Sequence, residues 1–176
     1  MTDIIQDIET VVASLRDPII DPLAKGAGSP YFEYGHRHEI AMGLDIKNLD
    51  NKYKYQKFPL IALRLDIPEI KTGGGITEYS LNLAIVESTQ KQYNARQRKA
   101  NVFDPILEPL YVRFMEALKT SGLFFWQGQQ YEPPHTKINR YFWGTPGPEK
   151  NEKNIFNEPI DAIEIINLRL KKLPNC

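Results

Sequence analysis

The sequence is poor in cysteine and has no excess of charge of either sign. Its single cysteine, Cys176, excludes a disulfide framework and a metal site built from several cysteines. The 176 residues carry 22 basic and 22 acidic side chains, whereas a dedicated nucleic-acid-binding protein usually has a basic excess. Disulfide scaffolds, multi-cysteine metal proteins and strongly basic binding domains are therefore excluded.

Long apolar runs are also absent. No stretch of about 18 apolar residues predicts a membrane-spanning helix. Asp3, Asp7 and Glu9 are unlike the cationic start of a signal peptide. Aromatic residues nevertheless make up 11% of the chain, which is too many for a disordered protein. We therefore expect a soluble globular chain, and its length suits one domain.

Two segments have the periodicity of a helix. The first begins with Thr2 as a candidate N-cap and ends at Asp17, because a residue before proline avoids the helical region. The second is expected to begin with Asp104 as N-cap and Pro105 as first helical residue, and to end at Ser121-Gly122. The apolar face of the first helix consists of Ile4, Ile8, Val11, Val12 and Leu15.

The remaining apolar segments indicate strands. Residues 31–46 are strand-like, because His36, His38, Ile40, Met42, Leu44 and Ile46 share one parity. The nearly continuous apolar run 58–67 predicts a central strand covered on both faces. Residues 78–86 alternate cleanly and predict a half-buried partner strand after the turn at 73–75. Residues 123–126 are expected to form a short aromatic strand or a buried loop, 137–143 a further strand, and 160–170 a long, bulged strand.

This order of elements predicts an α+β fold. We expect a mostly antiparallel β-sheet with an N-terminal helix, a second helix packed across it, and long ordered loop excursions. The chain is expected to form a single domain over residues 1–176. Its core would comprise about 1–122 and 158–173, with a loop excursion at 123–157.

Sequence motifs for catalysis or metal binding are absent. His36 and His38 lie two residues apart and would share a strand face, but no further ligand completes a metal site. The three glycines at 73–75 are not followed by the Lys-Ser/Thr of a phosphate-binding loop. We therefore predict no catalytic residues, no metal and no cofactor.

Two clusters are candidates for contacts with a partner. Arg96, Arg98 and Lys99 could bind phosphate, although a solvated helix face or a protein contact is the more common role of such a cluster. The aromatic residues between 124 and 143 could stack on bases or sugars, but such bands more often form core and interface. Long loops at 17–35 and 127–158 favour an assembled protein, because structureless loops of this length are uncommon in compact domains.

The order of these elements and several short strings resemble the tail-completion, or tail-terminator, type of neck protein in tailed bacteriophages. The strings are Phe58-Pro-Leu-Ile-Ala-Leu63, the strand 79–86, and Asp104-Pro-Ile-Leu-Glu-Pro-Leu-Tyr-Val-Arg-Phe-Met-Glu-Ala-Leu118. The ending 157–170 is similar to proteins of this kind from phages of Bacteroides-type hosts. The likeness covers about 1–120 and 158–172, whereas 123–157 departs from it.

The resemblance implies a non-enzymatic virion protein that is made in the bacterial host cytoplasm. Such proteins form rings, commonly hexamers, at the head–tail junction, next to connector or portal-side and tail proteins, and DNA passes through the lumen without specific binding. The residues expected at subunit contacts are Arg96, Arg98, Lys99, Trp126, Tyr131, Tyr141 and Trp143. The alternatives are a ligand- or carbohydrate-binding module that uses the aromatic band, and an enzyme of unrecognised type.

Overall fold

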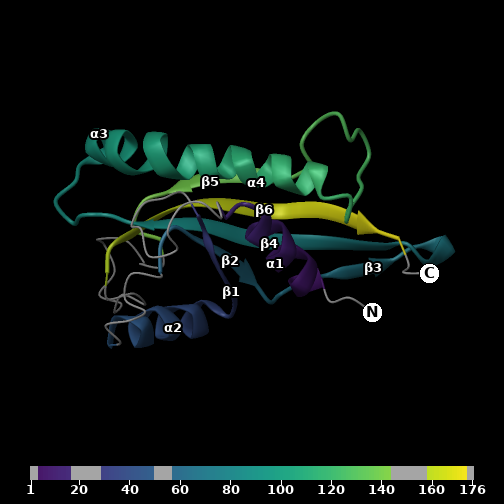
Figure 1. Ribbon diagram of the computed structural model, residues 1–176, viewed down its shortest axis with the longest axis horizontal. Coiled ribbons are helices and arrows are strands. Elements are labelled where there is room, and N and C mark those ends of the chain that lie inside the picture. Colours follow the sequence, from purple (N-terminus) through teal and green to yellow (C-terminus); the bar gives the residue numbers. More distant parts are fainter. Residues whose placement is uncertain (1–3, 17–28, 50–56, 144–157, 174–176) are drawn as a thin grey trace.

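The structure is a computed structural model that describes residues 4–16, 29–49, 57–143 and 158–173 (Figure 1). Its strands form one mixed sheet in the order β1-β2-β4-β6-β5, and β3 pairs with the start of β4. Among the strands of the described residues, β1 and β2 run parallel and every other neighbouring pair is antiparallel. The strands are β1 (Tyr31–Gly35), β2 (Leu60–Arg64), β3 (Glu69–Lys71), β4 (Thr77–Ser88), β5 (Thr136–Arg140) and β6 (Ile160–Lys172). The predicted α+β class with a mostly antiparallel sheet is confirmed.

The antiparallel pair β4–β6 is the centre of the sheet. It extends from Thr77 opposite Lys172 to Ser88 opposite Ile160. A β-bulge interrupts the register between Leu81 and Leu83, where β6 carries one residue more than β4. Asn167 adopts a φ of 55° there and donates its backbone N–H to Asn82 Oδ1 at 3.1 Å. The predicted bulge of the last strand is thus confirmed.

Helices cover one face of the sheet. They are α1 (Ile4–Ser14) and a continuous helical run made of α3 (Ala95–Arg98), the π-helical segment η2 (Lys99–Leu107) and α4 (Glu108–Thr120), which lies along the sheet (Figure 1). Ile8, Leu107, Phe114 and Leu118 of these helices are fully buried. They pack against Ile61, Leu81, Ile85, Ile163 and Leu168 of the sheet, and this main core contains most of the buried apolar residues.

The second long helix begins earlier than predicted. Asn94 caps it, because its side chain accepts the backbone N–H of Gln97 while the Gln97 side chain accepts that of Asn94, each at 3.0 Å. Asp104-Pro105 therefore does not start the helix. Pro105 lies inside the π-helical segment, where the wider turn accommodates a residue without an N–H. Gly122, with a φ of 68°, ends the helix as expected.

The prediction of a strand over 31–46 was wrong beyond Gly35, because helix α2 (Arg37–Leu49) follows β1. Side chains cap the start of this helix: the Glu39 carboxylate accepts the His36 backbone N–H at 2.7 Å. His36 and His38 consequently do not share a strand face, and their rings stack at 5.3 Å between centroids. The alternation was misleading because Met42 and Ile46 are exposed, by 64% and 63%.

Helix α2 covers part of the other face of the sheet. Its Ile40, Ala41 and Leu44 pack in a second, smaller core with residues of β2, β4 and β6 and with Trp143. Trp143 donates its indole N–H to Glu164 Oε1 at 2.9 Å, and Arg140 binds the other oxygen of Glu164. Glu164 of β6 thus binds both Arg140, the last residue of β5, and Trp143, which belongs to the second core.

The other strand predictions have mixed outcomes. Strands β2 and β4 lie within or around the predicted runs and pair with each other as expected. Strand β3 was missed, and β5 ends at Arg140 rather than at 143. Of the two alternatives for 123–126, the buried loop is the one found: Phe124 and Trp126 are buried, and Phe125 makes only an isolated bridge with Lys171. Of the predicted excursions 17–35 and 127–158, residues 17–28 and 144–157 lie outside the described residues, and the described parts contain β1 and β5.

A buried ion pair joins the start of the long helix to β6. Arg98 Nη1 lies 2.6 Å from Asp161 Oδ1, and the two side chains are 2% and 0% exposed. Arg98 also donates to the carbonyls of Tyr93 and Gln90, at 3.0 and 3.1 Å, and its guanidinium lies 3.8 Å from the centroid of the Phe142 ring. Arg98 therefore holds together the β4–α3 connection, the helix and β6.

Breaking this pair should destabilise the protein strongly. Arg98→Met leaves Asp161 charged, buried and without its counter-ion, so the free energy of unfolding should fall by about 3–5 kcal/mol. The double variant Arg98→Met/Asp161→Asn should recover part of that loss. Chemical denaturation measures both, with Arg96→Met at a neighbouring exposed position as the control. A loss no larger than that of the control would contradict this role.

Candidate functional site

The predicted basic cluster does not act as one unit. Arg96 and Lys99 are exposed at the start of the long helix, whereas Arg98 is buried inside the chain. The ammonium of Lys99 lies 2.6 Å from Asp104 Oδ1, and this hydrogen bond and charge raise the pKa of Lys99 above its ordinary value. Only Arg96 and Lys99 remain available for a contact with another molecule.

The predicted aromatic band is also divided. Trp126 and Trp143 are only 5% and 2% exposed, and the Trp126 indole N–H donates to the Tyr131 carbonyl at 3.1 Å. The side chains of Tyr131 and Tyr141 are exposed, and Tyr141 packs edge-on against Phe103. The two tryptophans therefore belong to the cores, and the band does not form a stacking platform for bases or sugars.

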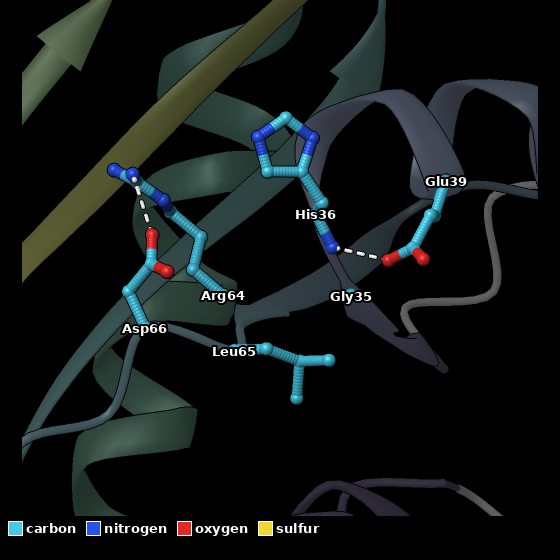
Figure 2. A pocket seen from close by; sticks show the side chains of 6 residues that line it. All are labelled: Gly35, His36, Glu39, Arg64, Leu65 and Asp66. Carbon is cyan, nitrogen blue, oxygen red and sulfur yellow. Dashed lines mark hydrogen bonds and ion pairs between the residues drawn. The ribbon is translucent and has the colours of Figure 1, made fainter.

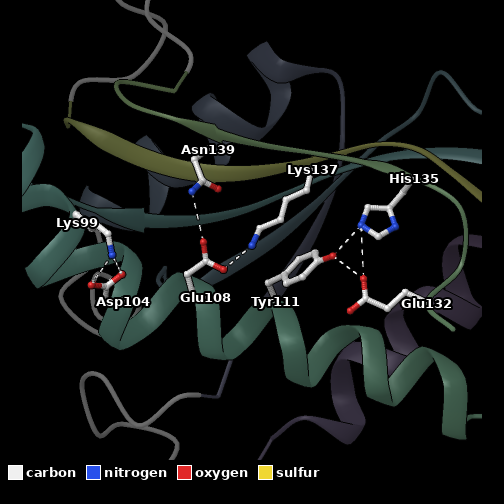
Figure 3. A network of polar contacts seen from close by, with 8 residues as sticks. All are labelled: Lys99, Asp104, Glu108, Tyr111, Glu132, His135, Lys137 and Asn139. Carbon is white, nitrogen blue, oxygen red and sulfur yellow. Dashed lines mark hydrogen bonds and ion pairs between the residues drawn. The ribbon is translucent and has the colours of Figure 1, made fainter.

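The structure brings together a polar network that the sequence did not predict (Figure 3). The Tyr111 hydroxyl of α4 lies 2.8 Å from Glu132 Oε2 and 2.7 Å from His135 Nε2. The other ring nitrogen of His135, Nδ1, lies 2.7 Å from the carbonyl oxygen of Pro133. Tyr111 thus joins the first turn of α4 to the segment that leads into β5.

The protons of this network can be assigned from its acceptors. The Pro133 carbonyl can only accept, so Nδ1 of His135 carries a proton. The Tyr111 hydroxyl has one proton, and an ionised Glu132 can only accept it. His135 Nε2 also lies 3.9 Å from Glu132 Oε2, so the three side chains form one polar cluster.

A second group of contacts extends the network along β5. Glu108 of α4 forms an ion pair with Lys137 and accepts a hydrogen bond from Asn139 at 3.3 Å. The ammonium of Lys137 lies 4.2 Å from the centroid of the Tyr111 ring. Burial, followed by the hydrogen bond and charge of Glu132, raises the pKa of Tyr111 above its ordinary value. The hydroxyl is thereby kept neutral, and the network holds α4 against β5.

A small pocket lies where β1 and β2 end (Figure 2). It has a volume of about 190 Å³ and is lined by Gly35, His36, Glu39, Arg64, Leu65 and Asp66. Arg64 and Asp66 form an exposed ion pair at 3.5 Å, and the Glu39 carboxylate is engaged with the start of α2. Typical small-molecule sites are larger, about 300–1,000 Å³, and mostly apolar. Within the described residues, no three His, Cys, Asp or Glu side chains are placed to hold a metal ion.

The residues of the polar network are far apart in the sequence, which explains why they were missed. Tyr111 and His135 are separated by 24 positions, and Tyr111 follows the apolar period of its helix. The only local signal was Glu132-Pro-Pro-His135, in which two titratable side chains flank a rigid turn. Spacing alone could not show which helix residue meets them.

Comparison with known proteins adds no relative: no family model, no curated protein and no solved structure matches this chain. In the part of the chain that the structure describes, every helix is too short or too polar to cross a membrane.

Removing the Tyr111 hydroxyl should loosen the contact between α4 and β5. Tyr111→Phe leaves Glu132 and His135 without their shared partner, so the free energy of unfolding should fall by about 1–2 kcal/mol. Chemical denaturation measures the loss. Tyr131→Phe is the matched control, because this tyrosine is 70% exposed and should be replaceable without effect. Equal stability of the two variants would count against the network.

Glu87 should make stability depend on pH. Glu87 is on β4, opposite Asp161 of β6. Burial raises the pKa of Glu87, although hydrogen bonds from Ser88 oppose the shift. A raised folded-state pKa contributes stability below the ordinary value of 4.5, and that contribution is lost as the pH rises through the raised value. Glu87→Gln should therefore gain stability over wild type between acidic and neutral pH, as followed by denaturation across that range. A gain that does not change with pH, or one equal to that of the exposed Glu116→Gln, would contradict the assignment.

Proposed function

We propose that this chain is a non-enzymatic structural subunit that assembles into a ring at the head–tail junction of a tailed phage. The resemblance of the element order and of residues 58–63 and 104–118 to neck proteins of tailed phages suggests the head–tail junction as the place of assembly. The general role of an assembling subunit is supported separately, by the way the sheet ends.

The observation that carries the proposal is that, among the described residues, no further strand pairs with either outer strand of the sheet. Strand β1 ends the sheet on one side and β5 on the other, and neither pairs outward with a strand among the described residues. An edge strand presents unpaired backbone N–H and C=O groups to another chain. Two different edges allow head-to-tail association, which closes into a ring when the rotation between subunits fits.

Exposed apolar side chains on α2 support the same role. Met42, Ile46 and Leu49 lie along its outer side and are 64%, 63% and 88% exposed. They follow a spacing of four and three residues, which places them on one helix face. Such a stripe is typical of a surface covered in an assembly.

Buried charges in the described part of the chain serve the fold. Asp7 pairs with Lys172, Lys57 with Glu158, Arg98 with Asp161, and Glu164 with Arg140. Each pair joins two segments of the chain, and these pairs do not converge on the pocket beside α2. This arrangement favours a structural role over catalysis.

The charge balance fits a channel for DNA. A channel lined by basic residues that neutralised many phosphates would bind DNA tightly. A ring of subunits with equal numbers of acidic and basic residues allows the DNA to slide. The competing binding module lacks support here, because the two tryptophans that it would use, Trp126 and Trp143, are buried.

The purified chain should form closed rings with a central channel, because both edges of each sheet would be engaged. Light scattering after size-exclusion chromatography measures the mass, and negative-stain imaging shows the ring. Cys176→Ser is the matched control, since assembly through backbone and side-chain contacts must survive loss of the only thiol. A monodisperse monomer at high concentration, with no ring in images, would overturn the proposed function.

A further inference from the structure

The two edge strands match in length and differ in charge. Strands β1 and β5 each contain five residues. Strand β1 carries Glu33 and no basic residue, whereas β5 carries Lys137 and Arg140 and no acidic residue. Arg140 remains half exposed although it binds Glu164. Each of these charges also has a partner within its own chain, namely Lys47, Glu108 and Glu164, so the two edges are complementary in the sign of the charges that the strands themselves carry.

The directions of the strands determine whether β5 of one copy and β1 of a second copy would pair parallel or antiparallel. Strand β1 is parallel to β2, and each further step through β4 and β6 to β5 is antiparallel. Strand β5 therefore runs opposite to β1. When two copies have the same orientation, β5 of one and β1 of the next meet antiparallel, and their helical layers stay on the same face.

Pairing of like edges is disfavoured by charge. An antiparallel pair of two β1 strands, centred on their middle residue, would place Glu33 directly opposite a second Glu33. Two β5 strands would bring together four cations, Lys137 and Arg140 from each copy. Like charges across a strand pair are destabilising, so each edge favours the other kind of edge.

Side-chain faces narrow the register. Glu33 points to the face of the sheet that α2 covers, because it forms an ion pair with Lys47 of α2. Phe32 packs into the main core on the opposite face, the helical side, which α1 and the long helix cover. Tyr34 shares the face of Phe32 by strand alternation and is 52% exposed. On β5, Lys137 faces the helical side, where it binds Glu108. Shifts of two residues would keep every face consistent, but only the register with Glu33 opposite Ile138 pairs all five residues of β1 with all five of β5. It places Tyr34 opposite Lys137.

We propose that β1 of one copy pairs antiparallel with β5 of the next, so that the sheet continues from subunit to subunit. Glu33 then lies diagonally opposite Arg140, and the ammonium of Lys137 lies beside the Tyr34 ring. The inference rests on the proposed ring function and names the strands that make its subunit contact.

Disulfide trapping tests this contact. Directly opposed residues of an antiparallel pair lie about 4.5–5.5 Å apart between Cα atoms, which suits a disulfide. Tyr34→Cys and Lys137→Cys are made separately in a Cys176→Ser background, and the two chains are co-expressed and oxidised. A cross-linked dimer should form when both variants are present and not with either alone. Ile70→Cys on β3, which is 58% exposed, replaces Tyr34→Cys as the control and should give no dimer with Lys137→Cys.

The outcomes separate this inference from the proposed function. Self-cross-linking of either variant would overturn the head-to-tail contact in favour of a symmetric one. Rings in negative-stain images without a Tyr34–Lys137 cross-link would overturn the β1–β5 pairing and leave the ring function standing. Absence of both rings and cross-links would overturn the two together.

Discussion

The long pairing of β4 with β6 is the constraint on which the rest of the structure depends. These strands lie at the middle of the sheet, where β2 pairs with β4 on one side and β5 pairs with β6 on the other. Helix α1 and the long helix cover the face of the sheet that forms the main core. The two strands are far apart in the sequence, so residues 89–159 must return the chain to the same sheet. The long helix and β5 lie within that return.

Polar contacts fix the long helix at two places. Arg98 binds Asp161 near the beginning of the helical run, and Tyr111 meets Glu132 and His135 further along it. Apolar packing alone allows small slides of a helix across a sheet, whereas hydrogen bonds with defined geometry specify one position. These titratable side chains, which resemble candidates for catalysis or ligand binding, therefore bind one another within the chain. Among the described residues, the outer sides of β1 and β5 pair with no further strand, and α2 exposes Met42, Ile46 and Leu49.

The elements with a regular apolar period were predictable from the sequence. Helix α1 and strands β4 and β6 follow such a period, and burial enforces it. Strand β2 was recognisable instead as a continuous apolar run, because the two cores bury both of its faces. Helix α2 was mistaken for a strand because the exposed Met42 and Ile46 imitate a period of two. The start of the long helix was misplaced because Asp104-Pro105 resembles a cap, whereas the capping box of Asn94 and Gln97 lies ten residues earlier. Burial of Arg98 and the meeting of Tyr111 with His135 depend on tertiary contacts, which no local spacing encodes.

The bulge at Asn167 bears on how this sheet could change length over evolution. Before it, the core side chains of β6 are Ile163 and Ile165, and after it they are Leu168 and Leu170, so the odd positions give way to the even ones. Loss of Asn167 alone would leave Ile163, Ile165, Leu168 and Leu170 in unbroken alternation. The core is therefore compatible with either strand length. Because a bulge bends its strand and increases the local twist, this single extra residue acts on the curvature of the sheet, and a one-residue insertion or deletion here is a simple route by which related chains could adjust it.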